Sequence, residues 1–308
     1  MSATNWPVKT CEIRNHHMDS SIWDEFTFRE GDIIVATYAK SGTTWVQQIV
    51  SQLLNDGQEG IDIMTRSPWL ELRIAPREAT LACLEGQQHR RSLKTHLPAN
   101  ALTSSPKAKY VYVARDGRDV CWSLYNHHAN FNQEAYRQLN DTPGRIGPPL
   151  EPPTDSIREY FLSWLDRDGF PFWSFWENVR SWWAIRSLPN LLLVHYADLK
   201  ADIAGEMRRI ATFLGIPIDE SRWPVLVEHC TFDYMKRNGP TNLPLVEHFL
   251  NGGAATFINK GTNGRWRDVL SAADSARYEE IARQQLGPAC AKWLAAGRQV
   301  GQRSLRSA

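Results

Sequence analysis

The stretch Thr37 to Trp45, TYAKSGTTW in one-letter code, constrains the fold of this chain more than any other feature. An apolar run from Ile33 to Ala36 precedes it, and apolar residues at helical spacing follow it from Val46 to Leu54. The pattern predicts a strand, a tight loop and a helix. Amide groups at a helix N-terminus, two threonine hydroxyls and a lysine ammonium suit an anion such as phosphate or sulfate. A Walker A loop carries its lysine after the last glycine, whereas Lys40 precedes Gly42, so this is an anion loop of another kind.

Further strands and helices alternate along the chain. Buried strands are predicted at Ile33 to Tyr38, Ser92 to His96, Tyr110 to Arg115 and Leu191 to Tyr196. Helices are predicted at Thr43 to Leu54, Arg118 to Ala129, Ile203 to Leu214 and Ala272 to Gln299, the last interrupted near Gly287. The alternation predicts an α/β fold, a three-layer P-loop-like domain with a central parallel sheet flanked by helices.

Local composition predicts where the loops and part of the core lie. Segments rich in proline and glycine, Asn140 to Pro153 and Asn238 to Ala255, are predicted to be loops that together cover a ligand. The aromatic-rich stretch from Phe161 to Trp183 is either core or a lid over a ligand, and core is favoured because aromatic clusters are more often buried.

The charge balance and the cysteines exclude several functions. The 35 Lys and Arg against 34 Asp and Glu give a net charge of +1, which gives no reason to expect nucleic-acid binding. Five scattered cysteines without a C-x-x-C pair indicate neither disulfides nor a zinc site. The polar N-terminus, Met1 to Asp19, and the lack of a long apolar run favour a cytoplasmic protein without membrane spans.

A second motif, Lys94-Thr95-His96-Leu97-Pro98, ends the second predicted strand. Ligands of open α/β sheets bind at the carboxyl ends of strands, so His96 and Lys40 are expected to face one space. Imidazole titrates near neutrality and suits a general base that takes a proton from a hydroxyl. In a third motif Arg115 leaves the next strand and Ser123 follows in the predicted helix, where both can hold a phosphate.

These motifs together resemble the sulfotransferases that use 3′-phosphoadenosine 5′-phosphosulfate (PAPS) and release 3′,5′-adenosine bisphosphate (PAP). The family patterns are T-Y-P-K-S-G-T-T-W, K-[TS]-H-L-P and Y-x-x-R-[ND]-x-[KR]-D-x-x-x-S-x-Y, and the resemblance spans Ile33 to about Leu270. It implies one domain of residues 1–308, with a nucleotide-binding core at about 30–270 and a helical region at about 272–300. Catalytic roles then fall to His96 as base, to Lys40 at the leaving group and to Lys94 at the sulfuryl oxygens.

The resemblance also implies the cofactor-binding residues. The 5′-phosphosulfate loop contributes Lys40, Ser41, Gly42, Thr43 and Thr44, and the adenine site contributes Trp45, Tyr196, Cys230 and Phe232. The 3′-phosphate site contributes Arg115, Ser123, Asn259, Lys260 and Gly261. Two positions depart from the family's R-K-G-x-x-G-D-W-[KR]: Asn259 replaces an arginine, and Arg265 replaces an aspartate and offers a compensating charge.

The acceptor site and the oligomeric state are less constrained. Family pocket positions map onto His16, Trp69, Leu72, Phe131 and Phe249, which implies an aromatic or hydrophobic small-molecule acceptor, although Trp69 and Leu72 also fit a core role. The family's dimer segment, K-x-x-x-T-V-x-x-x-E, is not matched at Arg267 to Ala276, so the oligomeric state stays open. No metal is implied.

Two rival functions remain. One is an ATP-dependent small-molecule kinase with Mg²⁺, which lacks a Walker A loop here and would need Asp116 or Asp198 as the metal ligand. The other is a protein that binds PAPS or PAP without catalysis, which the presence of both His96 and Lys40 disfavours.

Overall fold

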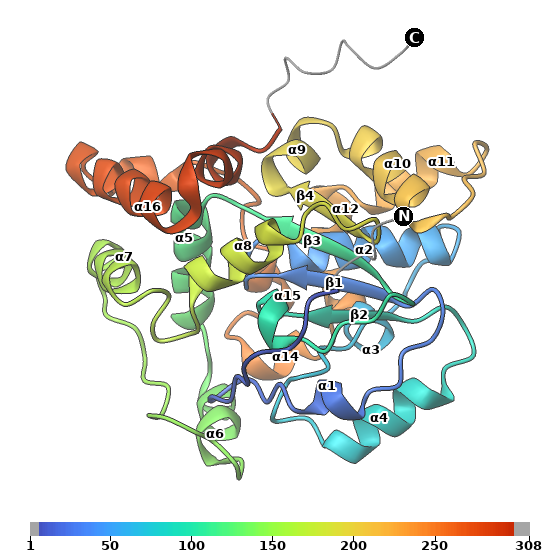
Figure 1. Ribbon diagram of the computed structural model, residues 1–308, viewed down its shortest axis with the longest axis horizontal. Coiled ribbons are helices and arrows are strands. Elements are labelled where there is room, and N and C mark those ends of the chain that lie inside the picture. Colours follow the sequence, from blue (N-terminus) through green and yellow to red (C-terminus); the bar gives the residue numbers. More distant parts are fainter. Residues whose placement is uncertain (1–5, 299–308) are drawn as a thin grey trace.

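Four parallel strands form the centre of the computed structural model, which describes residues 6–298 (Figure 1). The strands are β1 (Ile33–Thr37), β2 (Ser92–Thr95), β3 (Lys109–Ala114) and β4 (Leu191–His195), in the order β2-β1-β3-β4. The predicted strands are therefore confirmed to within one residue at each end. Tyr196, predicted to end the fourth strand, instead begins a helix.

Helices surround the sheet. They are α1 (Ile22–Glu25), α2 (Thr43–Leu54), α3 (Ile63–Arg66), α4 (Arg77–Gly86), η1 (Ala99–Ala101), α5 (Gly117–His128), α6 (Gln133–Asp141), α7 (Ile157–Asp166), α8 (Phe175–Ala184), α9 (Tyr196–Ala201), α10 (Ile203–Leu214), α11 (Trp223–His229), α12 (Phe232–Arg237), α13 (Gly239–Asn242), α14 (Val246–Phe249), α15 (Gly253–Phe257), η2 (Arg265–Asp268) and α16 (Ala272–Ala296). No helix within residues 6–298 is both long and apolar enough to cross a membrane.

The sheet is covered on both faces, because successive residues of a strand point to opposite sides. In β1, Ile33 and Val35 belong to a cluster that includes α2, α10 and α11, whereas Ile34 and Ala36 belong to one that includes α5, α7, α8 and α16. The predicted three-layer α/β arrangement is confirmed. Burying both faces also explains why the strands read as apolar runs without alternation.

The aromatic-rich stretch from Phe161 to Trp183 is mostly core. Trp164, Trp176 and Trp182 are buried, and the ring of Trp182 stacks on Tyr112 of β3 with 5.4 Å between centroids. Phe172 and Trp173 are the exceptions that also reach a cavity. The core interpretation therefore holds for most members of the stretch, and the cavity-facing interpretation holds for the exceptions.

The prediction of a loop from Asn238 to Ala255 is wrong, because α13, α14 and the start of α15 lie there. Pro240 occupies the first turn of α13, where a missing N–H costs nothing. The Glu247 carboxylate accepts a hydrogen bond from the Ala254 amide at 2.9 Å and so ties α14 to α15. The other predicted loop does form, after α6 ends at Asp141. Gln299, the predicted end of the last helix, lies outside the described residues.

Candidate active site

The loop between β1 and α2 forms the floor of the site. It turns through left-handed backbone conformations at Lys40 (φ 66°) and Gly42 (φ 112°), and Gly42 is the N-cap of α2. A Cβ at Gly42 would lie 2.9 Å from Cδ2 of Tyr196, so glycine is also required for space. The first turn of α2 contains no acidic residue and no side chain caps it. Its amide groups and the positive end of the helix dipole are therefore available to an anion.

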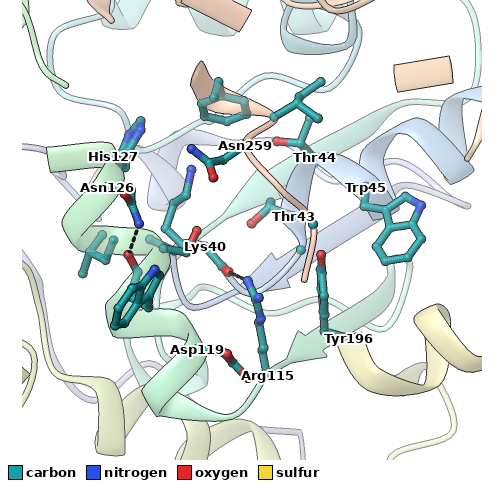
Figure 2. Close-up of a pocket in the computed structure, with 18 of the residues that line it drawn as sticks. Lys40, Thr43, Thr44, Trp45, Arg115, Asp119, Asn126, His127, Tyr196 and Asn259 are labelled. Atoms are coloured by element: carbon teal, nitrogen blue, oxygen red, sulfur yellow. Dashed lines mark hydrogen bonds between the residues drawn. The ribbon is translucent and has the colours of Figure 1, made fainter. Parts of the chain in front are cut away.

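A cavity of about 240 Å³ opens above this loop, where the carboxyl ends of the strands meet (Figure 2). Its lining carries six basic side chains, Lys40, Lys94, Arg115, Lys200, Lys260 and Arg265. Asp119 is the one acidic residue of the lining, and its carboxylate accepts a hydrogen bond from the Gly264 amide at 2.7 Å. A chain with a net charge of +1 thus concentrates positive charge in one place. The prediction that Lys40 and His96 share one space is confirmed.

The two lysines nearest the strand ends lie against aromatic rings. Nζ of Lys40 lies 4.1 Å from the centre of the Phe257 ring, and Nζ of Lys94 lies 4.8 Å from the centre of the Trp69 ring. No carboxylate among residues 6–298 forms an ion pair with either. Burial, with repulsion from Lys94 and Arg115, lowers the pKa of Lys40 to about 7, and burial lowers the pKa of Lys94 to about 8. The Glu71 carboxylate attracts Lys94 without forming an ion pair, and this attraction does not offset burial. Two buried lysines without an ion-pair partner in this part of the chain make the cavity a strong anion site.

The hydrogen bonds of His96 fix its tautomer. Nδ1 lies 2.9 Å from the carbonyl oxygen of Thr37, and a carbonyl can only accept, so Nδ1 carries the proton. Nε2 therefore holds a lone pair, and no hydrogen bond within the described part of the chain occupies it. Burial, together with the charges of Lys94 and Lys40, holds the pKa of His96 well below its usual range. The ring is a neutral acceptor at physiological pH, which is the state that a general base requires.

Thr37 connects this imidazole to the anion loop. Its carbonyl accepts from His96, while its hydroxyl lies 2.6 Å from that of Thr43 in the first turn of α2 and 3.1 Å from Nδ1 of His96. One residue at the end of β1 thus positions both the His96 imidazole and the first turn of α2.

Glu71 supports the other side of His96, and sequence analysis missed it. This fully buried carboxylate accepts from the His96 amide at 2.8 Å, from the Trp69 indole at 2.6 Å and from the Trp23 indole at 2.9 Å. Burial raises its pKa. A single glutamate among apolar residues carries no sequence signal, because its role depends on groups brought to it by the fold.

Arg115 holds the segment before η2 against the anion loop. Its guanidinium donates to the side-chain oxygen of Asn263 at 3.0 Å, to the carbonyl of Thr262 at 2.9 Å and to the carbonyl of Lys40 at 3.3 Å, the last of which is dashed in Figure 2. It also stacks 4.1 Å from the centre of the Tyr196 ring. Arg115 therefore builds the wall between the loop and the C-terminal motif.

Trp45 and Tyr196 form an aromatic corner with 5.3 Å between ring centroids (Figure 2). The Trp45 indole N–H donates to the carbonyl of Cys230 at 2.7 Å, and Phe232 lines the same part of the cavity. These rings offer flat apolar surfaces on which a planar nucleobase can stack. Next to them, Lys200 donates to the carbonyl of Gly261 at 2.7 Å.

Most of the predicted site residues line this one cavity. They are Lys40, Gly42, Thr43, Thr44, Trp45, Trp69, Lys94, His96, Arg115, Ser123, Tyr196, Phe232, Asn259, Lys260 and Gly261.

The remaining six predicted residues, Ser41, Cys230, His16, Leu72, Phe131 and Phe249, do not line it. The side chains of Ser41 and Cys230 are buried beneath the lining, although the carbonyl of Cys230 anchors Trp45. His16 is held by hydrogen bonds to Pro171 and His17. Leu72 pairs with Met18, and Phe131 with Leu250, in isolated bridges, while Phe249 ends α14.

Other lining residues escaped the sequence analysis: His17, Phe172, Trp173, His127, Thr256 and Phe257. His17 neighbours the predicted His16, and Trp173 lies in the aromatic stretch whose members were open to either role. No periodicity marks them, because each lies in an irregular segment or at an element end, except His127 in the last turn of α5.

Comparisons with known proteins agree with this geometry. The family described as "Sulfotransferase domain" matches residues 30–289 of the chain. A glycolipid sulfotransferase of Mycobacterium bovis is 32% identical over 302 residues, covering 91% of this chain and 92% of that protein. Human sulfotransferase 1C2 is 29% identical over 271 residues, covering 85% of each.

Solved structures are similar as well. Retinol dehydratase in complex with retinol and PAP superposes with a TM-score of 0.69 at 25% identity, covering 86% of this chain and 84% of that one. Mouse sulfotransferase SULT7A1 complexed with PAP gives a TM-score of 0.69 at 23% identity, covering 89% and 91%. The second likeness concerns the fold alone.

The geometry of Gly42 generates a prediction about anion binding. Substitution Gly42→Ala places a Cβ against Tyr196 at a positive φ, so it should distort the loop and weaken PAP binding about tenfold or more. Calorimetric titration of PAP measures this. Gly60→Ala is the matched control, because Gly60 also has a positive φ (70°) but a Cβ added there would meet no atom within 4 Å, and it is outside the cavity. Equal PAP affinity in the two variants would contradict the role given to the loop.

Proposed function

The chain belongs to the sulfotransferase family, and from that premise we propose that it transfers the sulfuryl group of PAPS to a hydroxyl or amine of a small aromatic or hydrophobic acceptor. The observation that carries the proposal is the combination in one cavity of a neutral imidazole with an open Nε2 and buried lysines that form no ion pair among the described residues. The first suits proton removal from an acceptor, and the second suits a leaving group that gains negative charge.

In the proposed step the acceptor oxygen forms a bond to sulfur while the bond between sulfur and the bridging phosphate oxygen breaks. The electron pair of the broken bond stays on the phosphate oxygen, where Lys40 and the Thr43 and Thr44 hydroxyls stabilise it. The acceptor proton moves to Nε2 of His96. Lys94, on the strand that ends just before His96, holds the sulfuryl oxygens. By analogy with phosphoryl transfer, positioning and electrostatics supply most of the rate enhancement.

The residues fit a strongly anionic nucleotide. We propose that Trp45, Tyr196 and Phe232 hold adenine, and that Arg115, Ser123, Lys260 and Gly261 hold the 3′-phosphate. Asn259 brings no charge, but Arg265 lines the same cavity and donates to the Asn259 side chain at 3.3 Å. We assign to Arg265 the positive charge that Asn259 lacks.

The kinase alternative is weaker because its proposed metal ligands are engaged elsewhere. The Asp116 carboxylate accepts two hydrogen bonds from the Arg118 guanidinium, at 2.7 and 3.0 Å, and Asp198 pairs with Arg298 at 3.3 Å. Neither aspartate lines the cavity. A protein that binds PAP without catalysis is disfavoured by the open Nε2 of His96, which the binding of PAP does not require.

We further propose that residues 1–308 form a single domain, since the two largest hydrophobic clusters of the described residues pack on one sheet. A cytoplasmic location and the absence of nucleic-acid partners also remain predictions of the sequence.

Nucleotide preference tests the cofactor assignment. PAP should bind roughly 10²-fold or more tightly than AMP or ATP with Mg²⁺, because several charge-assisted hydrogen bonds depend on the 3′-phosphate. Lys260→Ala should reduce the preference for PAP over AMP. Lys236→Ala is the control, since Lys236 lies on the adjacent α12 outside the lining and should leave the preference intact. Calorimetry that finds ATP with Mg²⁺ preferred over PAP would favour the kinase.

Replacement of the base tests the proton transfer. His96→Ala should lower kcat by roughly 10² to 10⁴ and leave PAP affinity within about threefold, because the imidazole acts on the acceptor and not on the nucleotide. Turnover of phenol with PAPS and PAP titration provide the two readouts. His89→Ala, at a histidine outside the cavity, is the control. Undiminished kcat in His96→Ala would remove His96 from the mechanism.

A further inference from the structure

Two adjacent histidines precede α1 and differ in what they face. His17 lines the cavity, whereas His16 does not. The segment that carries them is held by isolated bridges between Arg14 and Asp19 and between Met18 and Leu72, and by the carbonyl of His17, which accepts from the Arg73 amide at 2.8 Å. His17 is thus fixed in place although it belongs to no helix or strand.

Hydrogen bonds determine the tautomers of both rings. Nε2 of His16 lies 2.8 Å from the carbonyl oxygen of Pro171, which can only accept, so this nitrogen carries the His16 proton. In a neutral ring Nδ1 of His16 is then an acceptor. Nδ1 of His17 forms a short contact with it and must donate. By elimination Nε2 of His17 holds a lone pair, and no hydrogen bond among residues 6–298 occupies it.

The same aromatic walls enclose His17 and His96. The Trp69 ring lies 6.1 Å from His17 and 4.7 Å from His96 between centroids, and the Trp173 ring lies 5.9 Å from His17 and 5.7 Å from His96. Both histidines line one cavity. The acceptor end of the site therefore presents two imidazoles with open Nε2 atoms beside the rings of Trp69 and Trp173.

An open lone pair in an aromatic enclosure is costly unless a donor meets it. Burial, with the charges of its histidine neighbours and Arg73, holds the pKa of His17 well below its usual range, so the ring stays neutral and Nε2 does not become a donor. His17 consequently discriminates between groups that donate, such as hydroxyl or N–H, and groups that only accept, such as an ether oxygen.

We propose that Nε2 of His17 accepts a hydrogen bond from a second hydroxyl or N–H of the acceptor, so that the preferred substrates are aromatic or hydrophobic compounds with two donor groups, such as diols. One group is sulfated at His96 and the other is bound at His17. This inference rests on the proposed sulfotransferase function, and it adds a specificity-determining residue to that function.

Positional isomers of one ring test the inference. Phenol, catechol, resorcinol, hydroquinone and the monomethyl ether of each diol serve as acceptors for the full-length protein with PAPS, and kcat/KM is compared per reactive hydroxyl. At least one diol should exceed phenol by roughly threefold to tenfold, the effect of one hydrogen bond, and its methyl ether should lose that advantage. In His17→Phe the ratio of diol to phenol should fall to about one.

His128→Phe is the matched control, because His128 packs against the nearby Phe172 at 5.3 Å between centroids but does not line the cavity, and it should keep the diol preference. Where turnover is too slow to measure, the dissociation constants of the same compounds from the PAP-bound protein, followed by tryptophan fluorescence, supply the ratios. Sulfation of phenol with no diol preferred, or a preference that survives His17→Phe, would overturn the role of His17 and leave the sulfotransferase function intact. Failure of every compound to bind or react would overturn both.

Discussion

Two buried lysines that share a cavity, and that form no ion pair within residues 6–298, are the constraint on which this site depends. Lys40 and Lys94 lie against aromatic rings, and their lowered pKa values, about 7 and about 8, express the cost of that placement. A bound anion offsets the free-energy cost of burying these two charged groups. The strand order brings the two lysines together, because β1 and β2 are neighbours and the loop after β1 lies beside the end of β2. Arg115 joins them from β3 on the other side of β1.

Buried hydrogen bonds link the anion site to His96, the proposed base. Thr37 contacts both Thr43 in the anion-binding turn and the ring of His96, and Glu71 holds the His96 amide from the opposite side. Positioning within fractions of an ångström is what a transfer between two bound molecules requires. Glu71 also accepts a hydrogen bond from the Trp69 indole and so fixes this ring. The Trp69 ring lies next to the rings of both His17 and His96. One buried carboxylate therefore orients both the proposed base and the surface that we propose for the acceptor.

The sequence predicts the fold and the anion end of the site well because these follow from local patterns. Apolar runs mark strands that are buried on both faces, and the strand ends fix where Lys40, Lys94 and Arg115 meet. The acceptor end is different. Whether His16 or His17 faces the cavity depends on the direction of side chains in an irregular segment, and no periodicity sets that direction. The roles of Trp173 and Glu71 depend on partners far away in sequence. Proline and glycine near Asn238 favoured a loop, whereas three short helices tolerate them at their ends.

Proton uptake on PAP binding tests the central claim most directly, because it reports the charge state of the buried lysines. In the free protein at pH 8, Lys40 is mostly neutral, since its pKa is about 7, and a bound phosphate must raise that pKa. Phosphate groups are already ionised at this pH and release little. Calorimetric titrations at pH 8 in two buffers of different ionisation enthalpy should therefore show uptake of about one proton at Lys40 and up to about half a proton at Lys94. The uptake should decline towards pH 6, and Lys40→Met should remove its larger part and leave at most about half a proton from Lys94. No uptake at pH 8, or proton release, would contradict the account.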